Sequence, residues 1–77
     1  MDPKVFPIRI SLAVYQGREA TIYGAMGDTR NAAETWRRSV AIFDQLDREG
    51  YAIEADVRAE AEHARSEAAR TLAAIAP

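Results

Sequence analysis

The chain of 77 residues contains no cysteine, and this absence removes several classes of site at once. Without a thiol there is no disulfide, no cysteine nucleophile and no thiolate-bound metal. The length leaves room for a single small domain, residues 1–77, whose burial is limited and whose stability is modest. The apolar fraction of 48% and the charged fraction of 29% are those of an ordinary globular protein.

An excess of positive charge is also lacking. Ten basic residues stand against 12 acidic ones, which gives a net charge of −2 and predicts no nucleic-acid partner. Lys4 is the only lysine, so nearly all the basic residues are arginine. We interpret this bias, together with the many alanines, as the mark of a GC-rich bacterial genome. The arginines are scattered along the chain and do not converge on a phosphate site.

Long apolar runs are lacking as well. No stretch approaches the roughly 20 apolar residues that are needed to span a bilayer. The N-terminal sequence Met-Asp-Pro-Lys does not have the basic stretch and apolar run that are typical of a signal peptide. We therefore expect a cytoplasmic protein with no membrane partner.

Glycine and proline are few, and their positions divide the chain into three stretches of helical length. The breakers are Pro3 and Pro7, Gly27-Asp28, and Gly50. We predict an all-α fold of three helices in one helical domain. An antiparallel helical hairpin occupies about residues 8–48, and a C-terminal Ala-rich helix occupies about residues 53–76.

The first stretch, about residues 7–26, carries large apolar residues at spacings of three, four and seven. They are Ile8, Leu12, Tyr15, Ile22 and Met26. This spacing predicts one apolar stripe on a helix. Residues 8–12 also alternate between apolar and polar types, so a short strand is the alternative there. Gly27 stands where a helix commonly ends in a left-handed residue.

The second stretch begins at Asp28 or Thr29, because either side chain can cap a helix. Its apolar residues step by three and four: Ala33, Trp36, Val40, Phe43 and Leu46.

The third stretch has a thinner apolar face: Ile53, Val57, Ala61, Ala64, Ala68, Leu72 and Ile75. Such a face suits a helix that covers the end of a helical stack. We expect the larger aromatic residues to lie in the core: Tyr15, Tyr23, Trp36, Phe43 and Tyr51.

Two small residues in the middle of the chain each precede an aromatic residue by about one helical turn. Tyr23 comes three residues after Ala20, and Trp36 comes four residues after Ala32. With Ser39 at the next small position, residues 13–46 resemble a tetratricopeptide (TPR) repeat, an antiparallel helix pair of 34 residues. The resemblance implies that the chain is similar to the last repeat of a bacterial array together with the helix that covers its end.

Three residues depart from the family's pattern. Gln16 stands where the family often has Trp, Glu19 where it usually has Leu, and Asp44 where a proline commonly closes the repeat. Glu19 is the most serious departure, because a carboxylate at that position must reach solvent or find a partner.

TPR arrays generally bind peptides or proteins on the concave face of their first helices. Carried onto this chain by helical spacing, the resemblance implies a partner-binding face made of Val14, Gly17, Arg18, Thr21 and Gly24. One version of the family clamps C-terminal carboxylates with Lys and Asn, which this sequence lacks there. Small residues at these spacings also allow close packing against another helix, within the chain or between subunits. Both interpretations remain open at this stage.

Patterns that carry chemistry are lacking too. The serines have no nucleophile-elbow setting, and the glycines form no phosphate-binding loop. His63 and Glu67 lie one helical turn apart, but with no second histidine and no cysteine they do not predict a metal site. We expect no enzymatic activity, no metal and no cofactor.

A single TPR-like hairpin does not bury its own faces, because such arrays form their core between neighbouring repeats. We therefore expect the first-helix face and residues 5–8 to be covered by a protein or peptide partner, by self-association, or by a longer helical array. The main hypothesis is a protein–protein interaction module of TPR type. The alternatives are a structural element for homo-oligomerisation and a small regulatory, antitoxin-like protein that acts on an enzyme.

Overall fold

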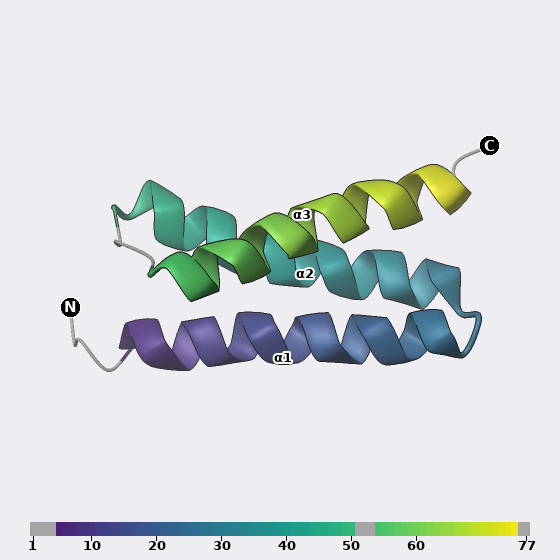
Figure 1. Cartoon of the computed structure of the whole chain (residues 1–77), viewed down its shortest axis with the longest axis horizontal. Coiled ribbons are helices and arrows are strands. Elements are labelled where there is room, and N and C mark those ends of the chain that lie inside the picture. The colour runs from purple at the N-terminus through teal and green to yellow at the C-terminus, as the bar shows by residue number, and fades with distance from the viewer. Residues whose placement is uncertain (1–4, 51–53, 76–77) are drawn as a thin grey trace.

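The chain folds into three helices in a computed structural model that describes residues 5–50 and 54–75, with side chains from residue 7 onward (Figure 1). The helices are α1 (Val5–Ala25), α2 (Thr29–Arg48) and α3 (Ala55–Ile75). The predicted all-α fold of three helices is confirmed. The alternative of a strand at residues 8–12 is wrong, because these residues lie inside α1.

A glycine with positive φ stands just beyond the end of α1 and of α2, as the sequence indicates. The φ angle is 79° at Gly27 and 77° at Gly50, a left-handed conformation that a residue without Cβ adopts at little cost. Asp28 then caps α2. Its carboxylate accepts hydrogen bonds from the backbone N–H of Asn31 at 3.2 Å and from the side-chain amide of Asn31 at 2.7 Å.

Helix α2 supplies the large core residues, and the helices on either side of it supply small ones. Trp36 is 5% exposed and Phe43 is 1% exposed. The alanines that join them in the core are Ala13 and Ala20 from α1 and Ala61 and Ala64 from α3. The apolar face expected for the second helix is confirmed, because its remaining members, Ala33, Val40 and Leu46, are buried or pack against this core.

The apolar face expected for α3 holds along most of the helix and is wrong near its end. Leu72 is 51% exposed, whereas Thr71 is buried. The steps of four and three that alternate from Val57 to Ala68 continue to Thr71, so Leu72 falls off the inward side. Ile53 lies outside the described residues.

Helices α1 and α2 run antiparallel, and α3 returns over α2 (Figure 1). Helix α3 packs on α2, touches α1 only slightly, and diverges from α1 toward its C-terminal end. An ion pair between Asp44 and Arg65, with 2.9 Å between oxygen and nitrogen, joins α2 to α3. Helix α2 continues past Asp44 to Arg48.

Candidate interaction surfaces of the first helix

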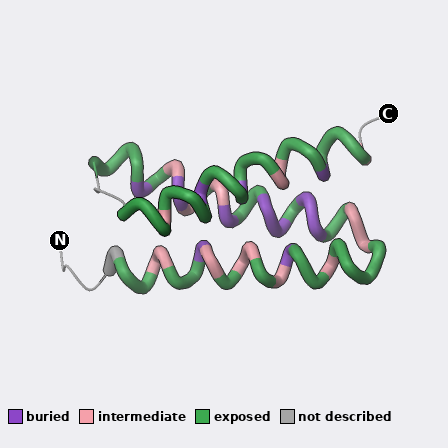
Figure 2. The backbone as a smooth tube through the Cα atoms, viewed as in Figure 1, coloured by how far each residue is buried: buried purple, intermediate pink, exposed green. Residues whose placement is uncertain are grey.

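The large apolar side chains of α1 lie on its solvent side. Ile8, Leu12, Tyr15, Ile22 and Met26, which we name the outer stripe, are between 47% and 69% exposed. Figure 2 shows the exposed residues of α1 along the edge that is turned away from α2 and α3. The stripe predicted from the sequence is therefore present as a surface feature. The expectation of a core position is wrong for Tyr15, and Tyr51 lies outside the described residues.

The edge of α1 that faces α2 is built from small residues. A Cβ atom added to Gly17 would lie only 3.0 Å from Cζ3 of Trp36, so the indole ring rests against the bare backbone of α1. The Ser39 hydroxyl donates a buried hydrogen bond of 2.8 Å to the carbonyl oxygen of Ala13. Because Ala13 and Ala20 are also small and fully buried, the two helices approach closely along this inner edge.

A groove opens between α1 and α3 on one side of the molecule, and α2 contributes to its lining. Its volume is about 460 Å³, which exceeds the ~300 Å³ at which ligand sites begin. Small side chains on α1, both Ala32 and the indole of Trp36 on α2, and polar side chains on α3 line it, the last including His63, Glu67 and Arg70. The groove therefore has a mainly apolar wall on α1 and α2 and a wall on α3 that carries charge.

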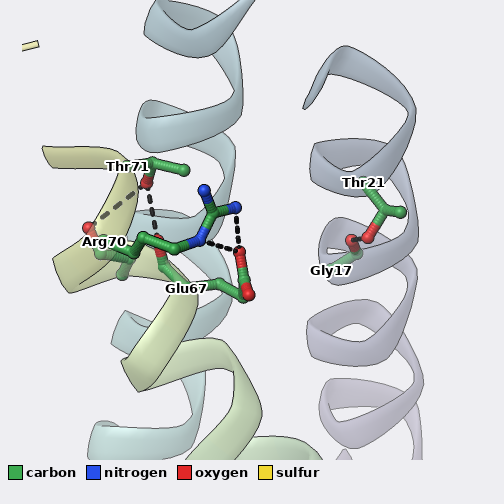
Figure 3. A network of polar contacts seen from close by, with 6 residues as sticks. Gly17, Thr21, Glu67, Arg70 and Thr71 are labelled. Carbon is green, nitrogen blue, oxygen red and sulfur yellow. Dashed lines mark hydrogen bonds and ion pairs between the residues drawn. The ribbon is translucent and has the colours of Figure 1, made fainter. Parts of the chain in front are cut away.

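Several polar side chains of the groove form hydrogen bonds within their own helix. The Thr21 hydroxyl donates to the carbonyl oxygen of Gly17 at 2.9 Å, and the Thr71 hydroxyl donates to that of Glu67 at 2.7 Å. Arg70 Nε donates to the Glu67 carboxylate at 3.0 Å. Figure 3 shows this pair on the side of α3 that faces Thr21 and Gly17.

The Glu67–Arg70 contact shifts the titration of both groups. The hydrogen bond from Arg70 lowers the pKa of the Glu67 carboxyl below its ordinary value. The same hydrogen bond raises the pKa of Arg70. Both groups are therefore charged at neutral pH, and the α3 wall presents a dipolar pair to the groove.

The His63 imidazole meets the indole of Trp36 edge to face, with ring centroids 5.5 Å apart and planes at 83°. Glu67, one turn further along α3, pairs with Arg70. Within residues 5–50 and 54–75, no three side chains of His, Cys, Asp or Glu gather as metal ligands. In this structure His63 contacts an indole and Glu67 forms an ion pair.

The five residues predicted as partner-binding do not form one surface. Thr21 and Gly24 line the groove. Gly17 lies against Trp36, as the close-packing alternative describes, and Val14 packs against the core. Arg18 is exposed and is not part of the groove lining.

Sequence reasoning missed the α3 wall of the groove. Glu67, Arg70 and Thr71 are spaced by three and four residues, which places them on one side of a helix. That spacing is visible in the sequence. The spacing alone does not say whether Glu67 pairs with His63 or with Arg70, because both lie one helical turn away. In the structure Glu67 forms a hydrogen-bonded ion pair with Arg70.

Two polar residues of α1, Gln16 and Glu19, are each partly buried. The Glu19 side chain is half-buried. Glu19 lies four residues after Tyr15 and three before Ile22, so it has the same spacing as the outer stripe. The Oε1 atom of Gln16 is buried and has no hydrogen-bond partner among the described residues. The Glu19 carboxylate therefore lies in the middle of the outer stripe, between Tyr15 and Ile22.

Within the part of the chain that the structure describes, no helix has both the length and the apolar character that crossing a membrane requires. No model of a protein family, no curated protein and no solved structure matches the chain.

Proposed function

We propose that this chain is a non-enzymatic protein–protein interaction module of TPR type that works through α1. The observation that carries the proposal is the outer stripe. Its five large apolar side chains are about half to two-thirds exposed on a helix whose other edge already forms the contact with α2. Monomeric proteins rarely expose contiguous apolar patches of more than a few hundred Å², and larger patches mark interaction surfaces.

The spacing of the outer stripe suits a helical or grooved partner. Its residues recur at intervals of three, four and seven, which is how one helix presents anchors to an apolar surface. The resemblance to a TPR repeat supports the same proposal, since the first helix of a repeat packs against the preceding repeat in an array. A cytoplasmic location and a bacterial origin remain predictions from the sequence.

A capture experiment with matched variants tests the proposal. The tagged chain is incubated with lysate from the cells that produce it and with an untagged copy of itself. We expect Ile22→Gln, which removes an apolar group from the outer stripe, to lose most of the captured protein. Leu72→Gln is the control, because Leu72 is similarly exposed at 51% but lies on α3. Equal capture by wild type and Ile22→Gln would refute the proposal.

A second candidate is the binding of a peptide segment in the groove, where Thr21 and Gly24 lie. It is favoured by the space above Gly24, where a Cβ atom would meet no atom within 4 Å, and by the charged pair on the α3 wall. Gly24→Arg would fill this space. Loss of capture in Gly24→Arg with retention in Ile22→Gln would assign binding to the groove in place of the outer stripe.

The regulatory alternative, a small antitoxin-like protein acting on an enzyme, would use the same surfaces. It differs from a structural module only in the partner. Identification of the captured protein by mass spectrometry decides between them: an enzyme whose activity falls on binding favours the regulatory role.

A further inference from the structure

We propose that the outer stripe is covered by a second copy of this chain, with the two α1 helices packed antiparallel about a two-fold axis near residue 17. The inference rests on the proposed function and names its partner. It follows from three properties of the stripe: its spacing, the charge in its middle, and its area.

The spacing of the stripe is self-complementary. Counting Glu19, its members stand at 8, 12, 15, 19, 22 and 26, so that intervals of four and three alternate and read the same from both ends. An antiparallel partner then places Ile8 opposite Met26 and Leu12 opposite Ile22. A two-fold interface requires this kind of match, because the same patch must serve both subunits. The alternating intervals are also those of the seam between two packed helices.

The carboxylate in the middle of the stripe distinguishes antiparallel from parallel packing. In a parallel pair every residue faces its own copy, so Glu19 would face Glu19, and like charges in contact are unfavourable. In the antiparallel pair Glu19 faces Tyr15 of the other copy, whose hydroxyl can donate a hydrogen bond to the carboxylate. Arg18, exposed beside Glu19, brings two positive charges to the axis against the two carboxylates. The charge at the axis is therefore balanced.

The area of the stripe sets the strength of the association. Five large side chains with this exposure offer on the order of 500 Å² of apolar surface from each copy. This is less than the ~800 Å² per partner of a standard stable interface and lies in the range of weak complexes. We therefore expect a reversible dimer that forms at micromolar to submillimolar concentrations.

Sedimentation velocity of the whole chain, from about 5 to about 500 µM, tests the association. We expect the average mass to rise from monomer toward dimer across this range and not beyond. Ile22→Gln should raise the dissociation constant by at least about tenfold, because two copies of the substituted residue enter each dimer. Leu72→Gln should leave it unchanged. A wild-type chain that stays monomeric throughout, or a dimer equally weakened by Leu72→Gln, overturns the inference.

Disulfide trapping tests the antiparallel register. Because the chain has no native cysteine, every disulfide that forms joins two introduced cysteines. Leu12→Cys and Ile22→Cys are prepared separately, and one of them carries a mass tag. We expect a mixture of the two to form tagged–untagged disulfides faster than either variant forms disulfides with itself. Faster cross-linking of each variant alone would indicate a parallel pair and overturn the register.

The outcomes also separate this inference from the proposed function. If the wild type is monomeric at every concentration while Ile22→Gln still loses a captured protein, the second copy is refuted and the outer stripe remains an interaction surface. If the wild type is monomeric and Ile22→Gln captures as much as wild type does, both proposals fail.

Discussion

Helices α1 and α2 distribute their large apolar residues in opposite ways. Helix α2 turns Trp36 and Phe43 into the core, whereas α1 turns Ala13, Gly17 and Ala20 inward and leaves the outer stripe exposed. The two helices have nearly the same length, 21 residues in α1 and 20 in α2. An apolar stripe thus identifies a surface suited to being covered, while small residues mark the edge along which a neighbouring helix comes close.

The largest expected effect tests the inner side of this comparison. Trp36→Ala should lower the free energy of unfolding by about 3–5 kcal/mol, since it removes a buried indole and leaves a cavity. Tyr15→Ala is the matched variant on the outer stripe and should change stability by about 0.5 kcal/mol or less. Urea unfolding followed by circular dichroism at low protein concentration measures both. Similar losses of stability in the two variants would contradict this difference between α1 and α2.

The next effect concerns the space along α1. Gly17→Leu should destabilise the domain by about 1–3 kcal/mol, because even its Cβ atom comes too close to the indole of Trp36. Gly24→Leu meets open space and should leave stability unchanged or raise it by up to about 1 kcal/mol through helix propensity. Thermal unfolding of the two variants side by side gives the sign. A stabilising Gly17→Leu would show that the inner edge tolerates bulk.

A smaller effect is expected at the hydrogen bond between the two helices. Ser39→Ala removes the donor to the carbonyl oxygen of Ala13 and should cost about 0.5–1.5 kcal/mol. The loss is limited because alanine fits the same space. Ser66→Ala, on an exposed face of α3, serves as control and should be close to neutral in the same urea titration. A neutral Ser39→Ala would mean that size alone, and not this bond, defines the inner edge.

The smallest effect on stability is expected at Glu67, which lies on the α3 wall of the groove. Because the pKa of Glu67 is lower in the folded chain than in the unfolded one, its contact with Arg70 stabilises the folded state above the ordinary pKa of glutamate. This contribution is lost as the pH falls through the lowered pKa. Glu67→Gln should therefore be slightly less stable than wild type at neutral pH and equal to it at low pH. A difference that persists in strong acid would contradict the assignment.

Much of the fold could be predicted from local sequence. Gly27 and Gly50 mark the helix ends because left-handed residues are cheapest as glycine, and Asp28 begins α2 because its carboxylate reaches the free N–H of Asn31. The core side of α2 follows from the spacing of its large residues. These signals operate within one or two helical turns, so no knowledge of the other helices is needed.

The candidate surfaces could be predicted only in part. The spacing of the outer stripe locates the apolar residues of α1, but it does not say that Gly17 and Ala20 form the contact with α2. That choice depends on which residue of α2 faces each position, and the fit of Gly17 to Trp36 is a property of the pair. The groove likewise depends on how far α3 diverges from α1, which no spacing within a single helix encodes.

The slight contact between α1 and α3 has a consequence for how the chain reaches its native state. The contacts between helices mainly join α1 with α2 and α2 with α3, which are consecutive along the chain. Topologies of this kind have low contact order, and we expect the domain to fold within microseconds to milliseconds. Because the contacts join consecutive helices, a further helix could pack at either end of the stack without changing the contacts among α1, α2 and α3.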